Sequence, residues 1–373
     1  MKVLLTCGGT GGHIYPAVAI AKALQVQQPD VEILFVGAEY GMEKKLIPQE
    51  GFRLETITVT GLSRKNPLAA ARSLWQAGTG LLKAARIVKR FQPDVAIGTG
   101  GYVSGPAVLA AALQGIPTLI HEQNAFPGLT TRALARFASI VAVSHEAAVP
   151  RLPQAKRIVV TGLPIRPAFY QTQRGEARAR LGLPPEAAVI LSVGGSGGAL
   201  NINRIVCSAA PQLLANERTV LLQVTGDRYY DSVAEQAQAL GWPDAWEGRW
   251  QLIRFMQDMP AALAAADLVI SRAGASTLEE IAAVGVPAIV VPSPNVTDNH
   301  QEHNARALAQ QGAAVLILDN LLTEASLLAS VNRLLENPAE LKAMAKASKQ
   351  ASHPRATEDL VALVRSLSET SLQ

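Results

Sequence analysis

The stretch Gly8-Gly9-Thr10-Gly11-Gly12-His13 contains the residue types in this sequence that are best suited to chemistry. It follows an apolar run over 3–5 and precedes an apolar helical pattern over 14–24, which predicts a strand, a glycine turn and a helix. The backbone N–H groups of such a turn converge on an anion or a strongly polar group. His13 begins the helix, and its imidazole can exchange a proton near neutral pH. The turn is therefore expected to bind a ligand on which His13 acts.

Two common nucleotide-binding loops do not fit this turn. A Walker loop ends in Gly-Lys-Ser/Thr, which is not found here. A dinucleotide fingerprint requires a third glycine where Ile14 stands, and an acid at the end of the second strand, where Glu39 is a poor substitute. A tight turn without a ligand is the simplest alternative, although a glycine run costs conformational entropy without adding packing.

Polar clusters also follow other predicted strands. Tyr102 lies in the glycine-rich segment 99–106, and His121-Glu122-Gln123-Asn124 comes directly after an apolar strand over 118–120. A further polar run over 298–304 follows a later strand and could hold sugar hydroxyls. Ligands of open parallel sheets bind beyond the carboxyl ends of the strands, so these clusters are candidates for one site.

The segment 271–280 combines a glycine loop with a predicted helix start. Backbone N–H groups at such a place are expected to stabilise an anion by about 0.3–2 kcal/mol through the helix dipole alone. Glu280 falls one turn into the helix, where a carboxylate suits a pair of sugar hydroxyls. The simpler explanation, that acids favour a helix N-terminus, fits Glu279 better than Glu280.

The two halves of the chain repeat one plan. A strand over 3–6 leads to the glycine turn 8–12, and a strand over 189–193 leads to a second glycine turn, 194–198. Strands then alternate with helices in both halves, which is typical of doubly wound parallel sheets. The sequence therefore predicts an α/β fold of two Rossmann-like domains that face each other across a cleft. The expected boundaries are 1–163, 164–345, and a helical segment 346–373 that packs back toward the first domain.

Composition narrows the function further. The 373 residues exceed what one compact core accommodates, and the net charge of +4 does not by itself indicate nucleic acid. Cys7 and Cys207 lie far apart, which argues for a reducing compartment and against a disulfide scaffold. The stretch 95–120 has no charged residue, but its many glycines and prolines favour strands and a loop over a membrane-spanning helix.

Metal and nucleophile chemistry are both disfavoured. The chain has no Asp-x-Asp and no His-Glu-x-x-His, and His300 and His303 have helical spacing but no evident third ligand. We therefore predict no protein-bound metal. The segment Gly194-Gly195-Ser196-Gly197-Gly198 is not interpreted as a nucleophile elbow, and Ser196 is better interpreted as a phosphate-loop hydroxyl.

Four motifs together resemble one family. They are Gly-Gly-Thr-Gly-Gly-His, Gly-Gly-Tyr-Val-Ser-Gly-Pro, His-Glu-Gln-Asn and Ala-Gly-Ala-Ser-Thr-Leu-Glu-Glu, in this order along nearly the whole chain. The sequence is thereby similar to the peptidoglycan N-acetylglucosaminyltransferases, which are two-Rossmann-domain (GT-B) glycosyltransferases. The resemblance implies transfer of N-acetylglucosamine from UDP-GlcNAc to the C4 hydroxyl of the muramyl sugar of lipid I, giving lipid II and UDP. It also implies an N-terminal acceptor and membrane-docking domain, a C-terminal UDP-GlcNAc domain, and a peripheral location on the cytoplasmic face of the bacterial inner membrane.

The resemblance implies roles for single residues as well. The donor-binding residues are Thr10, Gly11, Gly12, Asn124 and Gln301 for the sugar and its surroundings, Arg166 and the Met256 backbone for uracil, Ser196, Ala275, Ser276 and Thr277 for the diphosphate, Glu280 for the ribose, and Asn203 as a support of the donor loop. Tyr102 and His121 are expected to contact the acceptor. Two family motifs each lack a side-chain amide here, at Leu163 and Gly197, so contacts from those positions do not carry over.

Displacement at the anomeric carbon needs a base and a stabilised leaving group. His13 is the best base by position and intrinsic pKa, and Glu122 is the second candidate, which could instead orient His13 or the acceptor. The leaving charge is expected to fall on loops of the second domain. No tightly bound cofactor is predicted, although a loosely bound Mg²⁺ could help the diphosphate to leave.

A basic segment is a candidate for membrane contact. From Arg64 to Arg90 the chain has seven basic residues and no acid. On a helix from Leu68 onward, one apolar stripe faces the core, and a second stripe with flanking basic residues suits an anionic bilayer. The predicted membrane contacts are Leu68, Trp75 and Leu82 with Arg72, Lys83 and Arg86. An ordinary solvated basic face is the equally weighted alternative, and Gly78 and Gly80 could break the helix.

Rival functions remain open at this point. A glycolipid glycosyltransferase with a diacylglycerol acceptor is the nearest, followed by a UDP-sugar epimerase, which would need more acids around the site. A nucleotide-linked oxidoreductase and a UDP-sugar-binding regulator without catalysis are less well supported. The expected partners are UDP-GlcNAc, lipid I, an anionic membrane surface and other cell-wall synthesis proteins, with no nucleic acid.

Overall fold

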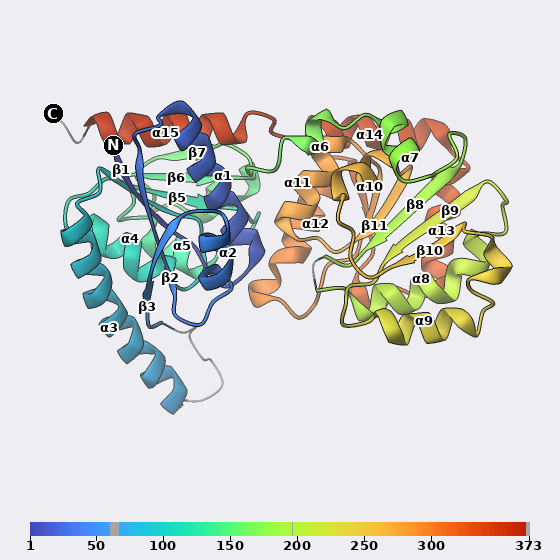
Figure 1. Cartoon of the computed structure of the whole chain (residues 1–373), viewed down its shortest axis with the longest axis horizontal. Coiled ribbons are helices and arrows are strands. Elements are labelled where there is room, and N and C mark those ends of the chain that lie inside the picture. Colours follow the sequence, from blue (N-terminus) through green and yellow to red (C-terminus); the bar gives the residue numbers. More distant parts are fainter. Residues whose placement is uncertain (60–66, 196, 371–373) are drawn as a thin grey trace. The chain divides into compact units, whose positions relative to one another are not determined.

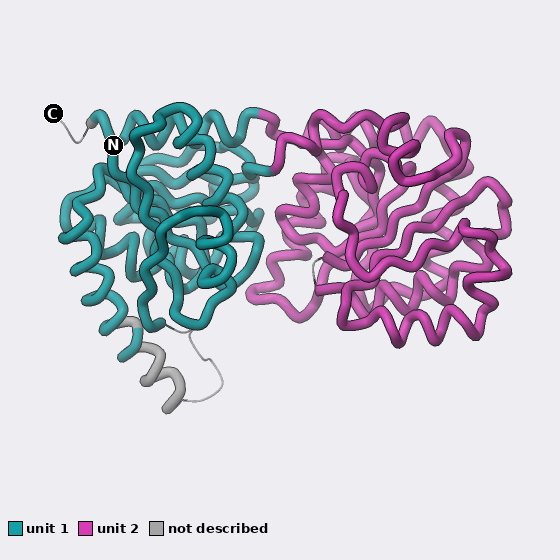
Figure 2. The backbone as a smooth tube through the Cα atoms, in the orientation of Figure 1, with its two compact units in different colours: residues 1–165, 355–373 teal, residues 166–354 magenta. Residues whose placement is uncertain are grey.

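The computed structural model describes residues 1–59, 67–195 and 197–370, without the side chains of 67–74, 77 and 370. The chain forms two compact units, Met1–Ile165 with Arg355–Gln373, and Arg166–Pro354 (Figure 2). The first junction therefore lies two residues after the predicted one. Residues 346–354, which we expected in the C-terminal segment, belong to the second unit.

Unit 1 contains a seven-stranded parallel sheet in the order β3-β2-β1-β4-β5-β6-β7. Its strands are β1 Lys2–Thr6, β2 Glu32–Ala38, β3 Arg53–Ile57, β4 Val95–Gly98, β5 Thr118–Glu122, β6 Ile140–Val143 and β7 Ile158–Val160. Its helices are α1 Gly11–Gln27, α2 Glu43–Gln49, α3 Pro67–Phe91, α4 Ser104–Leu113, α5 Leu129–Leu134 and α15 Ala356–Thr370, with a 3₁₀ helix η1 Glu146–Arg151. The strand order reverses between β1 and β4, where α/β sheets of this kind bind ligands.

Both faces of the first sheet are covered, as the almost continuous apolar strands require (Figure 1). Successive side chains of β1 point to opposite faces. Leu5 packs with α1 and α15 on one face, and Leu4 packs with α3 and α4 on the other. In α15, Leu360 and Val364 join the core around α1, so this last helix completes unit 1 although it follows the whole of unit 2 in sequence.

Unit 2 repeats the arrangement in a six-stranded parallel sheet, in the order β10-β9-β8-β11-β12-β13. Its strands are β8 Ala188–Val193, β9 Thr219–Val224, β10 Trp250–Ile253, β11 Leu268–Ser271, β12 Ala288–Val290 and β13 Ala314–Leu316. Its helices are α6 Ala168–Gln171, α7 Arg174–Arg180, α8 Leu200–Leu213, α9 Tyr230–Gln238, α10 Met259–Ala265, α11 Ala275–Val284, α12 His300–Gln310, α13 Glu324–Leu335 and α14 Pro338–Gln350, with 3₁₀ helices η2 Asp244–Trp246, η3 Thr297–Asn299 and η4 Asp319–Leu321. Here the order reverses between β8 and β11.

These sheets confirm the predicted fold class of two doubly wound Rossmann-like α/β domains. The uncharged stretch 95–120 becomes β4, a glycine loop, α4 and the start of β5. Within the described ranges, no helix is long and apolar enough to cross a membrane. The helix α3 runs through Gly78 and Gly80 without a break. Gly80 is needed for packing, because a Cβ there would lie 2.5 Å from Cγ1 of Val59.

Candidate active site

Two loops meet at the switch point of unit 1, one after β1 and one after β4. A Cβ on Gly101 would overlap the carbonyl oxygen of Gly8, and Gly101 has φ +81°, so a side chain there is excluded by both space and backbone conformation. The Ser104 hydroxyl donates to the carbonyls of Thr6 at 3.1 Å and Gly100 at 2.6 Å. The glycine turn 8–12 is therefore held against the second loop by direct backbone contact.

His13 lies between these loops, and the contacts of its Nδ1 indicate which tautomer the ring adopts. Its Nδ1 is 3.1 Å from the carbonyl oxygen of Gly8, which can only accept, so Nδ1 carries the proton. Nδ1 also lies 3.3 Å from Oγ1 of Thr10. This tautomer leaves the lone pair on Nε2. A Cβ on Gly100 would be 2.6 Å from Cδ2 of His13 and 3.0 Å from Nε2, so this glycine makes room for the ring.

Glu122, the second candidate base, is buried at the end of β5 and already accepts four hydrogen bonds. Oε1 accepts from the N–H of Asn124 at 3.0 Å and from its side-chain amide at 3.1 Å. Oε2 accepts from the N–H of Gly128 at 2.9 Å and from the Thr131 hydroxyl at 2.6 Å. Its carboxylate therefore orders the loop between β5 and α5 and orients Asn124.

The two predicted acceptor contacts differ in exposure. Tyr102 is partly exposed beside the glycine turn, and burial together with the charge of Glu43 raises the pKa of its phenol. His121 is fully buried, with Nε2 2.9 Å from the carbonyl oxygen of Gly162 and Nδ1 3.1 Å from the Gln123 amide nitrogen. A direct contact between His121 and an acceptor, as the resemblance implied, does not fit this burial. The His121 ring instead supports Gln123, whose amide also donates to the carbonyl of Thr99 at 2.6 Å.

In unit 2, the glycine loop after β8 is supported by Asn203. This side chain is fully buried in α8 and donates to the carbonyl of Thr225 at 2.9 Å. A Cβ on Gly198 would overlap the same carbonyl, so the loop and the end of β9 are in direct backbone contact. The role of Asn203 as a support of the donor loop stays a prediction. Ser196 lies outside the described residues.

The N-terminus of α11 is the second part of the unit 2 site. The first intrahelical bond runs from the N–H of Leu278 to the carbonyl of Gly274, so the N–H groups of Ala275, Ser276 and Thr277 have no acceptor within the helix. Gly274 is the N-cap and provides no side chain to satisfy them. Within the described residues, the helix therefore starts with N–H groups that no helix carbonyl accepts and with the positive end of its dipole, which together suit an anion.

Glu280 and Arg166 lie near each other in unit 2. Burial raises the pKa of the Glu280 carboxyl to about 7, and the positive charge of Arg166 acts in the opposite direction. Arg166 precedes α6, which packs against α10 and α11, and its guanidinium lies 5.0 Å from the centre of the Phe169 ring. Met256 stands in the loop just before α10, half-buried. Three segments thus bring the residues expected to bind uridine to one end of unit 2.

Gln301 lies in the first turn of α12. Its Oε1 accepts from the N–H of Ser293 at 2.8 Å, which fixes the orientation of the side-chain amide. The side chain is half-buried, so its NH₂ group is the part left to contact a sugar. Asn304, further along α12, is fully buried, and its amide nitrogen is 3.3 Å from the carbonyl oxygen of Ala273 before α11.

One polar side chain at the unit 1 site was missed by the sequence reasoning. Glu43, the first residue of α2, is fully buried beneath the glycine turn. Its signal in the sequence is an acid that follows the second strand and two glycines, Gly37 and Gly41. Glu39 was considered for that position instead. It is half-buried and accepts from the Thr58 hydroxyl at 2.9 Å.

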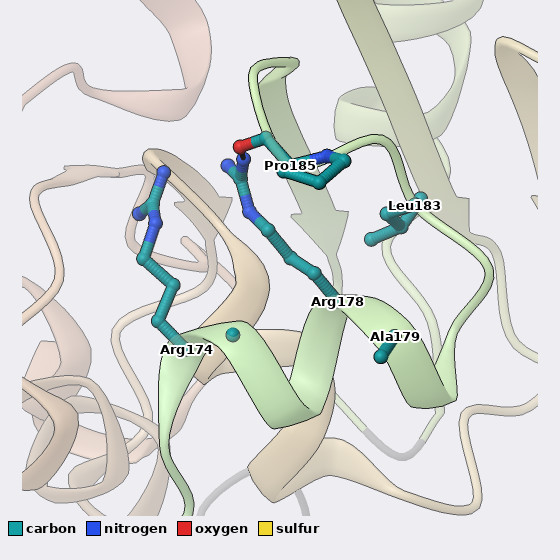
Figure 3. A pocket seen from close by; sticks show the side chains of 6 residues that line it. Arg174, Arg178, Ala179, Leu183 and Pro185 are labelled. Carbon is teal, nitrogen blue, oxygen red and sulfur yellow. Dashed lines mark hydrogen bonds between the residues drawn. The ribbon is translucent and has the colours of Figure 1, made fainter.

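A cavity of about 280 Å³ in unit 2 lies away from these residues (Figure 3). Arg174 and Arg178 of α7 line it, and both pair with Asp267, which precedes β11. The cavity is thus near the amino edge of the sheet, opposite to the loops above. Among the described residues, no group of three or more His, Cys, Asp and Glu side chains is arranged to hold a metal.

The comparisons with known proteins agree along the whole chain. Residues 3–143 match the N-terminal domain of glycosyltransferase family 28, and residues 189–360 match its C-terminal domain. Two curated relatives carry the name UDP-N-acetylglucosamine–N-acetylmuramyl-(pentapeptide) pyrophosphoryl-undecaprenol N-acetylglucosamine transferase. The one from Moorella thermoacetica is 45% identical over 98% of both chains, and the one from Desulforudis audaxviator is 44% identical over 98% of both chains.

A solved structure, MurG of Acinetobacter baumannii, has a TM-score of 0.79 and 32% identity, and the match covers 98% of this chain and 99% of that one. The relatives are similar in sequence across both domains, and the matching structure has the same two-domain architecture. The chain therefore belongs to glycosyltransferase family 28 and, within it, to the MurG family of N-acetylglucosamine transferases.

Proposed function

We propose that the protein transfers N-acetylglucosamine from UDP-GlcNAc to the C4 hydroxyl of the muramyl sugar in lipid I, giving lipid II and UDP. The observation that carries this function is the similarity over 98% of both chains, at 45% identity, to a transferase named for this reaction. The protein is a hexosyltransferase of peptidoglycan precursor synthesis. An acceptor of the diacylglycerol type is the alternative, and neither relative named above supports it.

His13 is the proposed base. The hydrogen bond from its Nδ1 to the Gly8 carbonyl leaves Nε2 as the atom that can take the proton of the C4 hydroxyl. The C4 oxygen then forms a bond to the anomeric carbon while the bond from that carbon to the diphosphate breaks. The electron pair of the broken bond leaves with UDP. A single displacement of this kind inverts an α-linked donor into a β-linked product.

The nucleotide part of the donor is proposed to bind to unit 2. The N–H groups at the start of α11, which no helix carbonyl accepts, suit the diphosphate, where negative charge increases as the bond breaks. Glu280 would accept from the ribose hydroxyls, and Arg166 and the Met256 backbone would hold the uracil. The remaining proposed donor contacts are Asn124, Gln301, Ser196 and the amides of Thr10, Gly11 and Gly12.

No tightly bound cofactor is proposed. The donors at the start of α11 carry partial positive charge and would perform the task that a metal performs in other transferases. A loosely bound Mg²⁺ on the donor diphosphate remains compatible with this mechanism.

Turnover assays test the reaction directly. Radiolabelled UDP-GlcNAc is supplied with lipid I, and separately with diacylglycerol, and the labelled products are separated. We expect label in lipid II and none in a glycosyl-diacylglycerol. The reverse result would replace the proposed acceptor, whereas release of free sugar alone would argue against transfer.

We also propose that unit 1 docks on an anionic membrane through α3. Trp75 is 72% exposed and Leu82 is 63% exposed on this helix, and Lys83 and Arg86 are exposed near them. The opposite side of α3, with Val88, is buried against the sheet. The side chains of Leu68 and Arg72 lie outside the described residues. A lipid-linked acceptor would require such docking, on the cytoplasmic face of the inner membrane, where other cell-wall synthesis proteins are candidate partners.

Liposome co-sedimentation tests the docking surface. Each basic residue at an anionic surface contributes about 1 kcal/mol, so Lys83→Glu with Arg86→Glu should release the protein from anionic vesicles at physiological salt. Trp75→Ser with Leu82→Ser should weaken binding by removing the apolar contact. If both pairs of substitutions bind as well as the wild type, the membrane surface lies elsewhere.

A further inference from the structure

A carboxylate is enclosed beneath the glycine turn of unit 1. Glu43 is 0% exposed, and its Oε1 accepts from the N–H of Ala38 at 2.8 Å. Its Oε2 accepts from the N–H of Gly9 at 3.3 Å. The side chain therefore connects the end of β2 to the turn that follows β1, two segments that are far apart in sequence.

Three glycines make room for this side chain. A Cβ on Gly8 would lie 2.5 Å from Oε1 of Glu43, and a Cβ on Gly37 would lie 2.6 Å from its Cγ. A Cβ on Gly41 would overlap the carboxyl group itself. Glycine costs conformational entropy on folding, so the chain bears this cost at three positions around one carboxylate.

The charge of Glu43 has no cationic partner in the part of the chain that the structure describes. Burying a charge is costly unless hydrogen bonds and counter-charges offset it, so a neutral side chain would be the simpler way to fill this space. The charge acts on its surroundings. It adds to the effect of burial in raising the pKa of Tyr102 and of the Cys7 thiol.

The position of Glu43 departs from what doubly wound folds usually show. In dinucleotide-binding domains, the acid after the second strand points outward and binds a ribose. Here the acid after β2 points under the turn and binds its backbone instead. An acid at this place is thus used to hold protein groups rather than a ligand.

We propose that Glu43 is a positioning residue for His13. It holds the N–H of Gly9, which orients the Gly8–Gly9 peptide so that the Gly8 carbonyl accepts from Nδ1 of His13. The proton is thereby kept on Nδ1, and Nε2 is kept ready to take the proton of the acceptor hydroxyl. The negative charge beneath the turn also favours the imidazolium that forms when the proton arrives. This inference rests on the proposed function of His13 as the base.

The test variant is Glu43→Gln, which keeps the size of the side chain. A carboxamide offers one oxygen and one NH₂ group, so it can accept from only one of the two backbone donors. The shorter bond, to Ala38, is expected to persist, and the bond to Gly9 is expected to be lost. We expect kcat to fall roughly 10- to 100-fold, because the variant removes part of the contribution that a general base makes. The KM for UDP-GlcNAc should not change.

The tautomer of His13 is the readout that separates positioning from stability. Long-range ¹H–¹⁵N spectra of the wild type should show the Nδ1–H form, whereas Glu43→Gln should show a mixture of tautomers. The matched control is Glu50→Gln, at the end of the same helix, where an exposed ion pair with Lys22 is lost. This control should leave both kcat and the tautomer unchanged. UDP affinity, measured calorimetrically, reports whether unit 2 is intact in each variant.

Glu43→Asp separates geometry from charge. It retains the negative charge, but its shorter side chain cannot reach both donors. We expect the same mixture of His13 tautomers as in Glu43→Gln. If either variant loses thermal stability while kcat and the tautomer stay as in the wild type, Glu43 is only a structural residue and the proposal is wrong.

The spectra require no acceptor, so they also separate this inference from the proposed function. If the wild type makes no lipid II, the proposed reaction fails, but the effect of Glu43 on the tautomer is still measured. If the wild type is active and His13 keeps one tautomer in both variants, the positioning inference fails alone.

Discussion

The two glycine turns, 8–12 in unit 1 and 194–198 in unit 2, occupy the same place in sheets of the same order but rest on different groups. Both follow the strand at the switch point, and both are in direct backbone contact with a neighbouring loop, through Gly101 and Gly198. A buried carboxylate, Glu43, lies beneath the first turn. A buried amide, Asn203, supports the second.

This difference suits each turn to a different partner. The Glu43 carboxylate accepts the N–H of Gly9, and its negative charge would repel an anion bound at the turn. The same charge stabilises a positively charged imidazole nearby. The amide is neutral and donates to a carbonyl, so it opposes no anion. Under the proposed function, the acidic support beneath the first turn suits proton transfer by His13, and the neutral support of the second does not repel a donor diphosphate.

The largest effect is expected from His13→Ala. Turnover should fall about 10²–10⁴-fold, because a positioned general base contributes this much. UDP affinity should not change, since the proposed nucleotide contacts are in unit 2. Initial rates with labelled UDP-GlcNAc and lipid I, together with calorimetry for UDP, measure both quantities.

Glu122→Gln provides the contrast. Its carboxylate accepts four hydrogen bonds, so this variant should mainly lower thermal stability and reduce turnover less than His13→Ala does. A larger loss of turnover in a stable Glu122→Gln protein would exchange the roles of the two residues.

The next effect is expected from Glu280→Ala. A charge-assisted hydrogen bond contributes about 1.5–3 kcal/mol, so losing the equivalent of one such bond to the ribose should raise the KM for UDP-GlcNAc about 10- to 100-fold. The value of kcat at saturating donor should change much less, and circular dichroism should show an intact fold. An unchanged KM would leave Glu280 as an acid that only favours the helix start.

A smaller effect concerns pH. Burial raises the pKa of Glu280 to about 7 in the folded protein, above its ordinary value of 4.5. The folded state therefore binds more protons than the unfolded state between these values, and the ionised carboxylate lowers stability above pH 7. Glu280→Gln should raise the melting temperature at pH 8 relative to the wild type, and this gain should shrink as the pH falls through 7 toward 5. An equal gain in melting temperature at pH 8 and at pH 5 would mean that the charge of Glu280 is not responsible.

The smallest effect is expected from metal removal. If the start of α11 stabilises the leaving diphosphate, activity should persist in excess EDTA, with at most a modest increase when Mg²⁺ is restored. Initial rates before and after chelation measure this. A complete loss of activity that Mg²⁺ reverses would assign the leaving charge to a metal. The start of α11 would then not be what stabilises the leaving diphosphate in unit 2.

Much of the fold was predictable because its signals are local. Apolar strands, glycine turns and helix patterns recur in both halves, and they predicted two doubly wound sheets, which the structure confirms. The alternative of a helix break at Gly78 and Gly80 is not realised, because α3 packs along the sheet and Gly80 fits closely against Val59. Packing against the rest of the unit outweighed the low helix propensity of glycine.

The residue types of the site and the family were likewise present in the sequence alone. The motif around His13 and the loop before Glu280 could be found because glycine and polar residues at strand ends have few other uses. What each polar side chain does was decided by tertiary contacts. Glu122 is saturated by groups on the following loop and helix, His121 is buried against Gly162, and Glu43 lies under a turn 34 residues away. Burial and hydrogen-bond partners of this kind depend on segments that are distant in sequence. Residue type and spacing therefore predicted where the site lies, whereas the contacts of each polar side chain were decided only by the folded chain.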